Sequence, residues 1–199
     1  MKDIKISTYI KTIIFVLLML VAISYPENLF DIIISNLLQI KSLNTVAKII
    51  SLIFHDKILL VLMVLLSAFL VYIKEYRKAT FIFFTAGVGG FLLTVIKYTV
   101  KRPRPLPELH DGFSFPSGHS LFVALFFLAL LYVINKKVIV GTVATFAIIL
   151  VPISRLIVGA HFLTDVVAGV LLASIIVDLM KIYHVYIYKL IMKFIPSKN

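Results

Sequence analysis

The sequence contains no cysteine, which excludes disulfide bonds, thiolate metal sites and cysteine nucleophiles. It is also poor in charge: 15% of its 199 residues are Asp, Glu, Lys or Arg, against about 25% in soluble domains. Hydrophobic residues make up 61% of the chain, and the mean hydropathy is +1.09. A chain this apolar could not hide its side chains from water, so we expect the lipid bilayer to be its solvent.

Six apolar stretches are long enough, or nearly long enough, to cross a membrane as helices, which takes about 20 residues each. They are Thr12–Tyr25, Ile58–Ile73, Ala79–Ile96, Ser117–Ile134, Val138–Ile153 and Phe162–Tyr183. Residues 26–56 have mixed polarity and are expected to form one or two helices in the membrane interface. The predicted fold class is all-α: a polytopic membrane protein with a six-transmembrane-helix bundle, formed by residues 1–199 as a single domain.

The first stretch has an alternative interpretation as a cleaved signal peptide, because Lys2, Lys5 and Lys11 precede its short apolar core. The segment Ala22-Ile23-Ser24 would then serve as the cleavage site. We favour a retained anchor, because polar residues around that site are scarce.

The net charge of +11 comes from 20 Lys and Arg residues against 9 acidic ones. These cations fall mainly between the apolar stretches, where they suit lipid headgroups and topology signals, and no nucleic-acid partner is expected. With six crossings, the positive-inside rule places both termini in the cytoplasm, on the face that carries 12 of the cations: Lys2, Lys5, Lys11, Lys74, Arg77, Lys78, Lys136, Lys137, Lys181, Lys189, Lys193 and Lys198. The other 8 would be extracytoplasmic: Lys41, Lys48, Lys57, Lys97, Lys101, Arg102, Arg104 and Arg155. Five of these eight lie in residues 97–104 and at position 155, and a bound anion would explain cations at such disfavoured positions.

Three segments contain residues that are chemically informative. The first two lie within residues 97–120, at the end of the third apolar stretch and the start of the fourth. Lys97 and Arg104 offer a point charge and a planar fork of donors to phosphate oxygens, although an ordinary basic membrane flank has the same composition. Further on, Ser117 is a helix-start residue, and a helix N-terminus attracts anions. Gly118 permits close approach of a ligand, and His119 is placed to donate a proton. The alternative for this second segment is a capped helix with an interfacial histidine.

The third segment joins the fifth and sixth stretches and contains Arg155, His161 and Asp165. His161 and Asp165 are four residues apart, so on a helix they would share a face. A carboxylate bonded to one imidazole nitrogen fixes the tautomer and leaves the other nitrogen free to attack. A purely structural His–Asp pair at a helix start is the alternative.

The alternating direction of the helices links these segments. The third and fifth stretches would end, and the fourth and sixth begin, on the same face of the membrane. Every segment falls at one of those four ends, which makes a shared site far more probable than three separate coincidences.

The motifs resemble those of the type 2 phosphatidic acid phosphatase superfamily. They are Lys97 with six residues to Arg104-Pro105, then Pro116-Ser117-Gly118-His119, then Ser154-Arg155 with five residues to His161 and three more to Asp165. The resemblance implies a metal-independent lipid phosphatase of the cell membrane, with its active site at the extracytoplasmic face. Phosphatidylglycerophosphate, undecaprenyl diphosphate and phosphatidic acid all remain open as substrates, and we lean toward a bacterial envelope lipid.

The resemblance also implies residue roles. His161 would attack phosphorus and form a phosphohistidine, Asp165 would orient it, and His119 would protonate the leaving oxygen. The phosphate oxygens would be held by Lys97, Arg104, Arg155, the Ser117 hydroxyl and the Gly118 amide. His110, in the proline-rich loop, is a candidate for head-group contact. No cofactor and no metal ion are expected, and the expected partners are the lipid phosphate and membrane lipids, with no obligate protein partner.

Three other functions compete with this one. A lipid phosphotransferase would use the same phosphohistidine, and a non-catalytic membrane scaffold would use only the fold. A transporter or channel would place charge near the bilayer midplane, whereas the centres of the second to sixth stretches carry essentially none.

Overall fold

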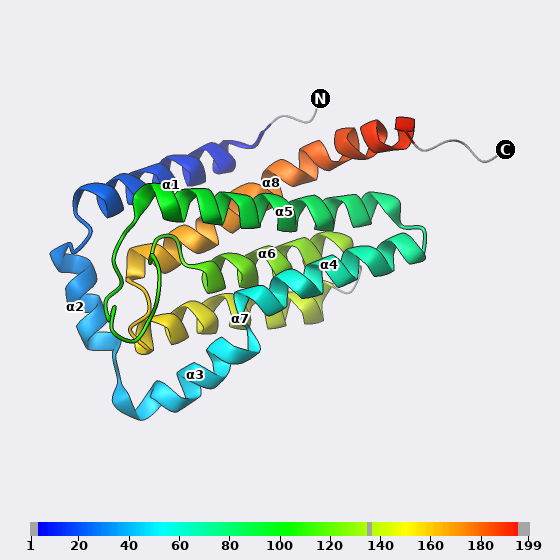
Figure 1. Cartoon of the computed structure of the whole chain (residues 1–199). Coiled ribbons are helices and arrows are strands. Elements are labelled where there is room, and N and C mark those ends of the chain that lie inside the picture. The colour runs from blue at the N-terminus through cyan, green and yellow to red at the C-terminus, as the bar shows by residue number, and fades with distance from the viewer. Residues whose placement is uncertain (1–3, 135–136, 195–199) are drawn as a thin grey trace.

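The computed structural model describes residues 4–134 and 137–194, and all regular structure within these ranges is helical (Figure 1). Lys2, Lys136 and Lys198, counted above toward the basic face, lie outside the described residues. The elements are α1 (Ile6–Ser24), α2 (Leu29–Leu38), a short 3-10 turn (Lys41–Leu43), α3 (Asn44–Ile53), α4 (Asp56–Tyr72), α5 (Tyr76–Val100), α6 (Gly118–Val133), α7 (Lys137–Ile157) and α8 (Leu163–Phe194). The predicted all-α class is confirmed.

Each predicted stretch corresponds to one helix: α1, α4, α5, α6, α7 and α8. Two helices extend furthest beyond their predicted apolar stretches. The first helix begins at Ile6, ahead of Thr12, because Thr8 and Lys11 both bond Asp178 of α8 and so are accommodated in the helix. The last helix continues past Tyr183 to Phe194. His184 in this extension is buried against Phe81 and Tyr132, and its Nδ1–H donates to the Met180 carbonyl at 2.8 Å.

Five helical stretches in the described part of the chain are long and apolar enough to cross a membrane. They are Ile6–Ser24, Lys41–Tyr72, Tyr76–Val100, Val138–Ile157 and Leu163–Lys193. The apolar helix α6 has 16 residues and is therefore about 24 Å long, less than the ~30 Å hydrocarbon core. The protein is a multi-pass membrane protein, and the count of six crossings stays a prediction. The expected interfacial region holds α2 and α3, and their depth in the membrane also stays a prediction.

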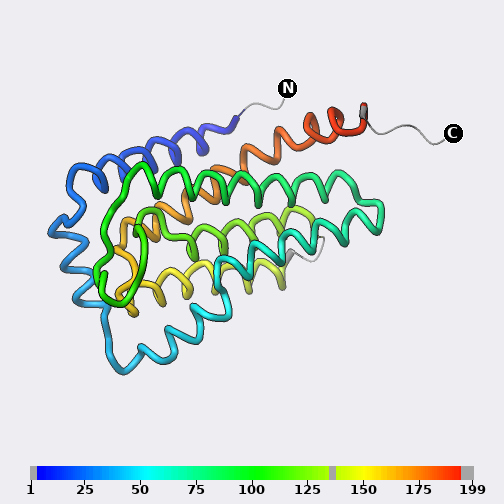
Figure 2. Tube along the Cα trace, viewed as in Figure 1, coloured from blue at the N-terminus to red at the C-terminus, as the bar shows by residue number. Residues whose placement is uncertain are grey.

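The long helices run side by side, with α6 in contact with α4, α5, α7 and α8 (Figures 1 and 2). Helix α1 packs on α8, and α3 packs on α7. The last turns of α8 and the connection between α4 and α5 lie at one end of the bundle (Figure 1). The opposite end carries α2 and the loop of residues 101–117, and we call it the loop end.

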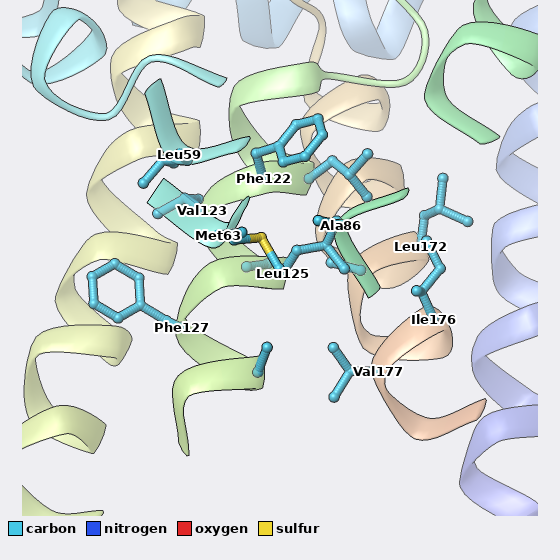
Figure 3. Packing of buried hydrophobic residues seen from close by; sticks show 14 of the residues in the cluster. Leu59, Met63, Ala86, Phe122, Val123, Leu125, Phe127, Leu172, Ile176 and Val177 are labelled. Carbon is cyan, nitrogen blue, oxygen red and sulfur yellow. The ribbon is translucent and has the colours of Figure 1, made fainter. Parts of the chain in front are cut away.

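The core surrounds α6 (Figure 3). Phe122 and Leu125 of α6 meet Met63 of α4 and Ala86 of α5, and all four side chains are buried. Large apolar side chains on the outer faces of α1, α4 and α7 are exposed, as expected for helices in contact with lipid. Because lipid tails are as apolar as these side chains, close packing of the helices contributes more to their association than the hydrophobic effect does.

Candidate active site

Four helix ends meet at the loop end: α5 and α7 finish there, and α6 and α8 begin there (Figure 1). The backbone ties two of these ends together, because the Ser117 N–H at the start of α6 donates to the Asp165 carbonyl in the first turn of α8, at 3.0 Å. Helix α5 ends with Lys101 in the left-handed conformation, φ 51°, which turns the chain into the loop. Pro103 and Pro105 then favour an extended backbone at Arg102 and Arg104.

His161 lies between Arg104 and Asp165. An N–H of the Arg104 guanidinium is 3.3 Å from His161 Nε2, and Asp165 Oδ2 is 3.6 Å from His161 Nδ1. A guanidinium has only donors, so Nε2 presents its lone pair and Nδ1 carries the proton toward Asp165. The distance to Asp165 is longer than a hydrogen bond, and His161 Nδ1 has no hydrogen-bond partner among the described residues. The ring therefore offers an unprotonated nitrogen to a ligand.

The expected helical pairing of His161 and Asp165 was wrong in one respect. Helix α8 begins at Leu163, so His161 precedes the helix and does not share a helical face with Asp165. The two side chains meet across the helix start instead. Asp165 Oδ2 accepts the Phe162 N–H at 2.9 Å, so the carboxylate closes the first turn and faces back toward the histidine.

Four positively charged or imidazole side chains surround His161. Burial lowers the pKa of His161 well below its usual 6.5, and Lys97, Arg104, Arg155 and His119 lower it further in that order. Charges influence a pKa this way only when they are close to it. The charges of the predicted phosphate-binding cations therefore act together on His161, and its lowered pKa favours the neutral ring.

The cations differ in how they are held. The Lys97 ammonium donates to the Phe113 carbonyl at 2.5 Å. Arg104 donates to the carbonyls of Asp111 and Gly112, at 2.9 and 3.1 Å, and to that of Ala160 at 2.8 Å. Arg155 differs from both, because its buried Nε has no hydrogen-bond partner within the described residues. A buried donor without a partner is costly, so Arg155 suits an anionic ligand.

The start of α6 is capped by Ser117, one of the two residues there that were predicted to contact phosphate. Ser117 is buried and caps α6, with its Oγ accepting from the Ser120 hydroxyl at 3.0 Å and the Ser120 N–H at 3.4 Å. A Cβ added at Gly118 would come within 2.7 Å of Asp56 Oδ2, so a carboxylate lies against this glycine. Gly118 was predicted to allow the close approach of a ligand, and the group that approaches it in the structure is the Asp56 carboxylate. Contact of Ser117 and Gly118 with phosphate stays a prediction.

A cavity of about 230 Å³ opens beside His119 and Arg155. Its lining comes from α3, the α3–α4 connection, the loop and the end of α7: Lys48, Ser51, Leu52, His55, His110, His119, Arg155 and Val158. His110 is fixed there by a 2.9 Å bond between its Nε2 and the Val158 carbonyl. The cavity thus brings the predicted head-group residue next to the predicted proton donor.

His55 and Asp56 had no role in the sequence analysis, because nothing in residues 26–56 indicated where that segment returns to the bundle. Their side chains lie 2.9 Å apart, and the His55 and His119 rings are 5.0 Å apart. The ligand atoms of His55, Asp56 and His119 lie within 4.8 Å of one another, a donor set that would accept a metal ion. Arg155 lines the same cavity, and its charge opposes a cation there.

Arg102 was also missed as a site residue. It is 1% exposed, and it bonds Asp165 Oδ1 at 2.7 Å and Asp31 Oδ2 of α2 at 2.7 Å. The sequence analysis counted it among the extracytoplasmic cations that a bound anion would explain. Its only signal was its position between Lys97 and Arg104, which does not distinguish a buried arginine from an exposed one.

Comparisons with known proteins agree with this geometry. The family model described as PAP2 superfamily matches residues 78–189. The chain is 32% identical over 134 residues to phosphatidylglycerophosphatase B of Bacillus subtilis, covering 62% of this chain and 66% of that protein. It is 32% identical over 103 residues to lipid A 1-phosphatase of Rhizobium johnstonii, covering 45% and 41%. The aligned regions are thus less than two thirds of each relative's length.

Two crystal structures share the fold. A transmembrane PAP2-type phosphatidylglycerolphosphate phosphatase from Bacillus subtilis superposes with a TM-score of 0.74 and 24% identity, over 96% of this chain and 98% of that one. Aquifex aeolicus LpxE gives a TM-score of 0.63 and 20% identity, over 79% and 98%.

Proposed function

Because this chain belongs to the PAP2 superfamily, we propose that it is a membrane lipid phosphatase that releases phosphate from a lipid phosphomonoester or diphosphate. The observation that carries the proposal is the setting of His161. Its Nε2 lone pair faces Arg104, its Nδ1 faces Asp165, and Lys97, Arg155 and His119 lie around it. Phosphoryl transfer asks a protein mainly for positioning and for compensating charge, and this arrangement offers both.

In the first step, the His161 Nε2 lone pair attacks phosphorus and the bond from phosphorus to the lipid oxygen breaks. His119 gives its proton to that departing oxygen, so the lipid leaves as a neutral alcohol, or as a lipid monophosphate if the substrate is a diphosphate. Lys97, Arg104 and Arg155 stabilise the charge on the remaining phosphate oxygens. Asp165 stabilises the positive charge that develops on the His161 ring.

In the second step, a water molecule attacks the phosphohistidine and gives a proton to His119. The bond from phosphorus to Nε2 breaks, inorganic phosphate leaves, and both histidines return to their starting states. Splitting the displacement in two replaces one difficult step with two easier ones. The three cations supply the charge that metal ions supply in two-metal phosphatases.

The named relatives act on different lipids, a phosphatidylglycerophosphate and lipid A. They support a lipid phosphate as substrate for this chain without choosing among head groups, and our choice of a bacterial envelope lipid rests on their sources. We also propose that the loop end faces away from the cytoplasm. The bundle end opposite the site carries Lys74, Arg77, Lys78 and the basic last turns of α8, as the positive-inside rule requires of a cytoplasmic end.

The experiment is a phosphate-release assay of the purified protein on a panel of phospholipid and polyprenyl mono- and diphosphates, with a chelator present. We expect release from at least one of them without an added acceptor alcohol. His161→Ala should abolish it. His184→Ala is the matched control, because His184 is a buried histidine near the other end of the bundle, and turnover per folded molecule should be unchanged. Release that requires an acceptor would indicate a phosphotransferase, and activity that survives His161→Ala would refute the mechanism.

A further inference from the structure

A buried ionic cluster lies behind the candidate active site and reaches outside the three motifs. Its members are Asp31 of α2, Arg102 of the loop, and Thr164 and Asp165 of α8. The side chains of Asp31, Arg102 and Asp165 are all 0% exposed. Asp31 precedes the region matched by the family model, residues 78–189, so nothing in that match assigns it a role.

Arg102 divides its guanidinium between the two carboxylates. Its Nη1 donates to Asp165 Oδ1 at 2.7 Å and to the Thr164 hydroxyl at 2.6 Å, while its Nη2 donates to Asp31 Oδ2 at 2.7 Å. Its Nε donates to the Pro26 carbonyl at 2.8 Å, and its face lies 4.3 Å from the centre of the Phe162 ring. Four of the five N–H donors of this arginine are occupied, so its orientation is fixed.

Asp31 is in turn fixed to the first turn of α8. Its Oδ1 accepts the Thr164 N–H at 3.1 Å, and its Oδ2 accepts the Thr164 hydroxyl at 2.6 Å. A first-turn N–H has no partner within its own helix, so Asp31 caps α8 from another part of the chain. Burial by itself raises the pKa of Asp31, but hydrogen bonds from Thr164, Arg102 and Asn28 outweigh it and leave the pKa below its usual value. Asp31 is therefore ionised.

The cluster decides what Asp165 can offer to His161. Both Asp165 oxygens are held, Oδ1 by Arg102 and Oδ2 by the Phe162 N–H, so the carboxylate cannot rotate away from the imidazole. If Arg102 paired with Asp165 alone, it would neutralise the negative charge of the Asp165 carboxylate. His161 needs that negative charge when its own ring becomes positive. A second carboxylate balances that arginine and leaves the Asp165 charge available.

We infer that Asp31 is a positioning residue for the His161–Asp165 pair and that it acts through Arg102 and Thr164. Helix α2, which carries Asp31, therefore contributes a residue that positions the active site. The inference rests on the proposed role of His161 as the nucleophile. A merely structural ion pair would affect how much protein folds, whereas a positioning residue affects how fast each folded molecule reacts.

The test compares Asp31→Asn with Asp178→Asn in single-turnover experiments, using a lipid phosphate that the unaltered protein hydrolyses. Asp178 is the matched control: it also joins α8 to an earlier helix, through its ion pair with Lys11 of α1, but it lies halfway along α8, well beyond the first turn that holds Asp165. We expect Asp31→Asn to lower the rate constant by about tenfold to a hundredfold, since misplacement by about 1 Å costs ~10²-fold. Asp178→Asn should lower only the amplitude or the thermal midpoint. An unchanged rate constant in Asp31→Asn would overturn the inference while leaving the proposed function intact.

A second readout does not depend on turnover. Nitrogen-15 NMR of the histidines reports the tautomer of each ring, and in the unaltered protein His161 should carry its proton on Nδ1. In Asp31→Asn we expect a mixture of tautomers at His161 and no change at His184. If the unaltered protein hydrolyses no lipid phosphate, the proposed function fails, and the tautomer result still decides whether Asp31 positions His161: an unshifted His161 signal contradicts it.

Discussion

Helices α8 and α6 approach closely at a glycine near the candidate site, and this contact gives a prediction with a calculable size. Gly169 of α8 is buried against the first turn of α6. A Cβ added there would lie 2.7 Å from the Ser117 carbonyl oxygen, 3.0 Å from Ser120 Cβ and 3.1 Å from the Leu121 nitrogen. Two of these three atoms are backbone, so no side-chain rotation relieves the contact.

The Gly169→Ala variant must therefore separate α8 from α6. Ordinary contact begins at 3.4 Å, so the 2.7 Å approach has to open by a few tenths of an ångström or more. Overpacking of this kind costs about 1–3 kcal/mol, which lowers the thermal midpoint by about 2–4 °C per kcal/mol in a chain of this size. The same movement carries His161 and Asp165 away from His119. Because ~1 Å of misplacement costs ~10²-fold, we expect turnover to fall about tenfold or more.

The assay is phosphate release by each variant together with its thermal midpoint in detergent. Gly87→Ala is the matched control: Gly87 also lies in a long helix, α5, and a Cβ there would meet nothing within 4 Å. That variant should keep its turnover and gain about 0.5–1 kcal/mol from the better helix propensity of alanine. A Gly169→Ala protein with unaltered turnover and midpoint would refute the packing argument.

Three further predictions address the chemistry. Arg155→Gln should lower turnover roughly 10²–10³-fold, as the loss of a transition-state donor does. The thermal midpoint should not fall, because the buried Nε of Arg155 has no partner among the described residues. A parallel loss of stability would mean that Arg155 is structural. NMR titration of His161 should give a pKa below 6.5, because burial and the neighbouring cations disfavour the charged ring. The nucleophile therefore stays neutral as the pH falls through 6.5. A pKa at or above 6.5 would contradict the described environment. Dialysis against a chelator should leave turnover unchanged, since Lys97, Arg104 and Arg155 supply the charge; loss of activity that a divalent ion restores would instead assign a metal to His55, Asp56 and His119.

Local patterns were enough to predict the helices and the convergence of the three motifs. The apolar stretches located six helices, and Ser117 was identified as the start of α6, because hydropathy and capping are encoded within a few neighbouring residues. The helix directions then placed Lys97, Arg104, Arg155 and His161 at one end of the bundle, and the structure brings them together around the His161 ring.

Contacts between distant segments could not be predicted in this way. Asp31 looks like an ordinary first-turn acid, since Asn28 caps α2 by accepting the Asp31 N–H at 2.9 Å. Only the folded chain reveals that its carboxylate reaches Arg102 and Thr164, 71 and 133 residues away. His55 was missed for the same reason: its position beside His119 depends on how α3 leads into α4.

The central claim is that His161 becomes covalently phosphorylated, and rapid quenching tests it most directly. A lipid phosphate labelled in its phosphoryl group is mixed with the protein, the reaction is stopped in alkali within one turnover, and the peptides are separated. We predict acid-labile label on the peptide that contains His161, formed at least as fast as phosphate is released, and neither label nor release with His161→Ala. Full phosphate release by His161→Ala, or label that resides on another residue, would contradict it.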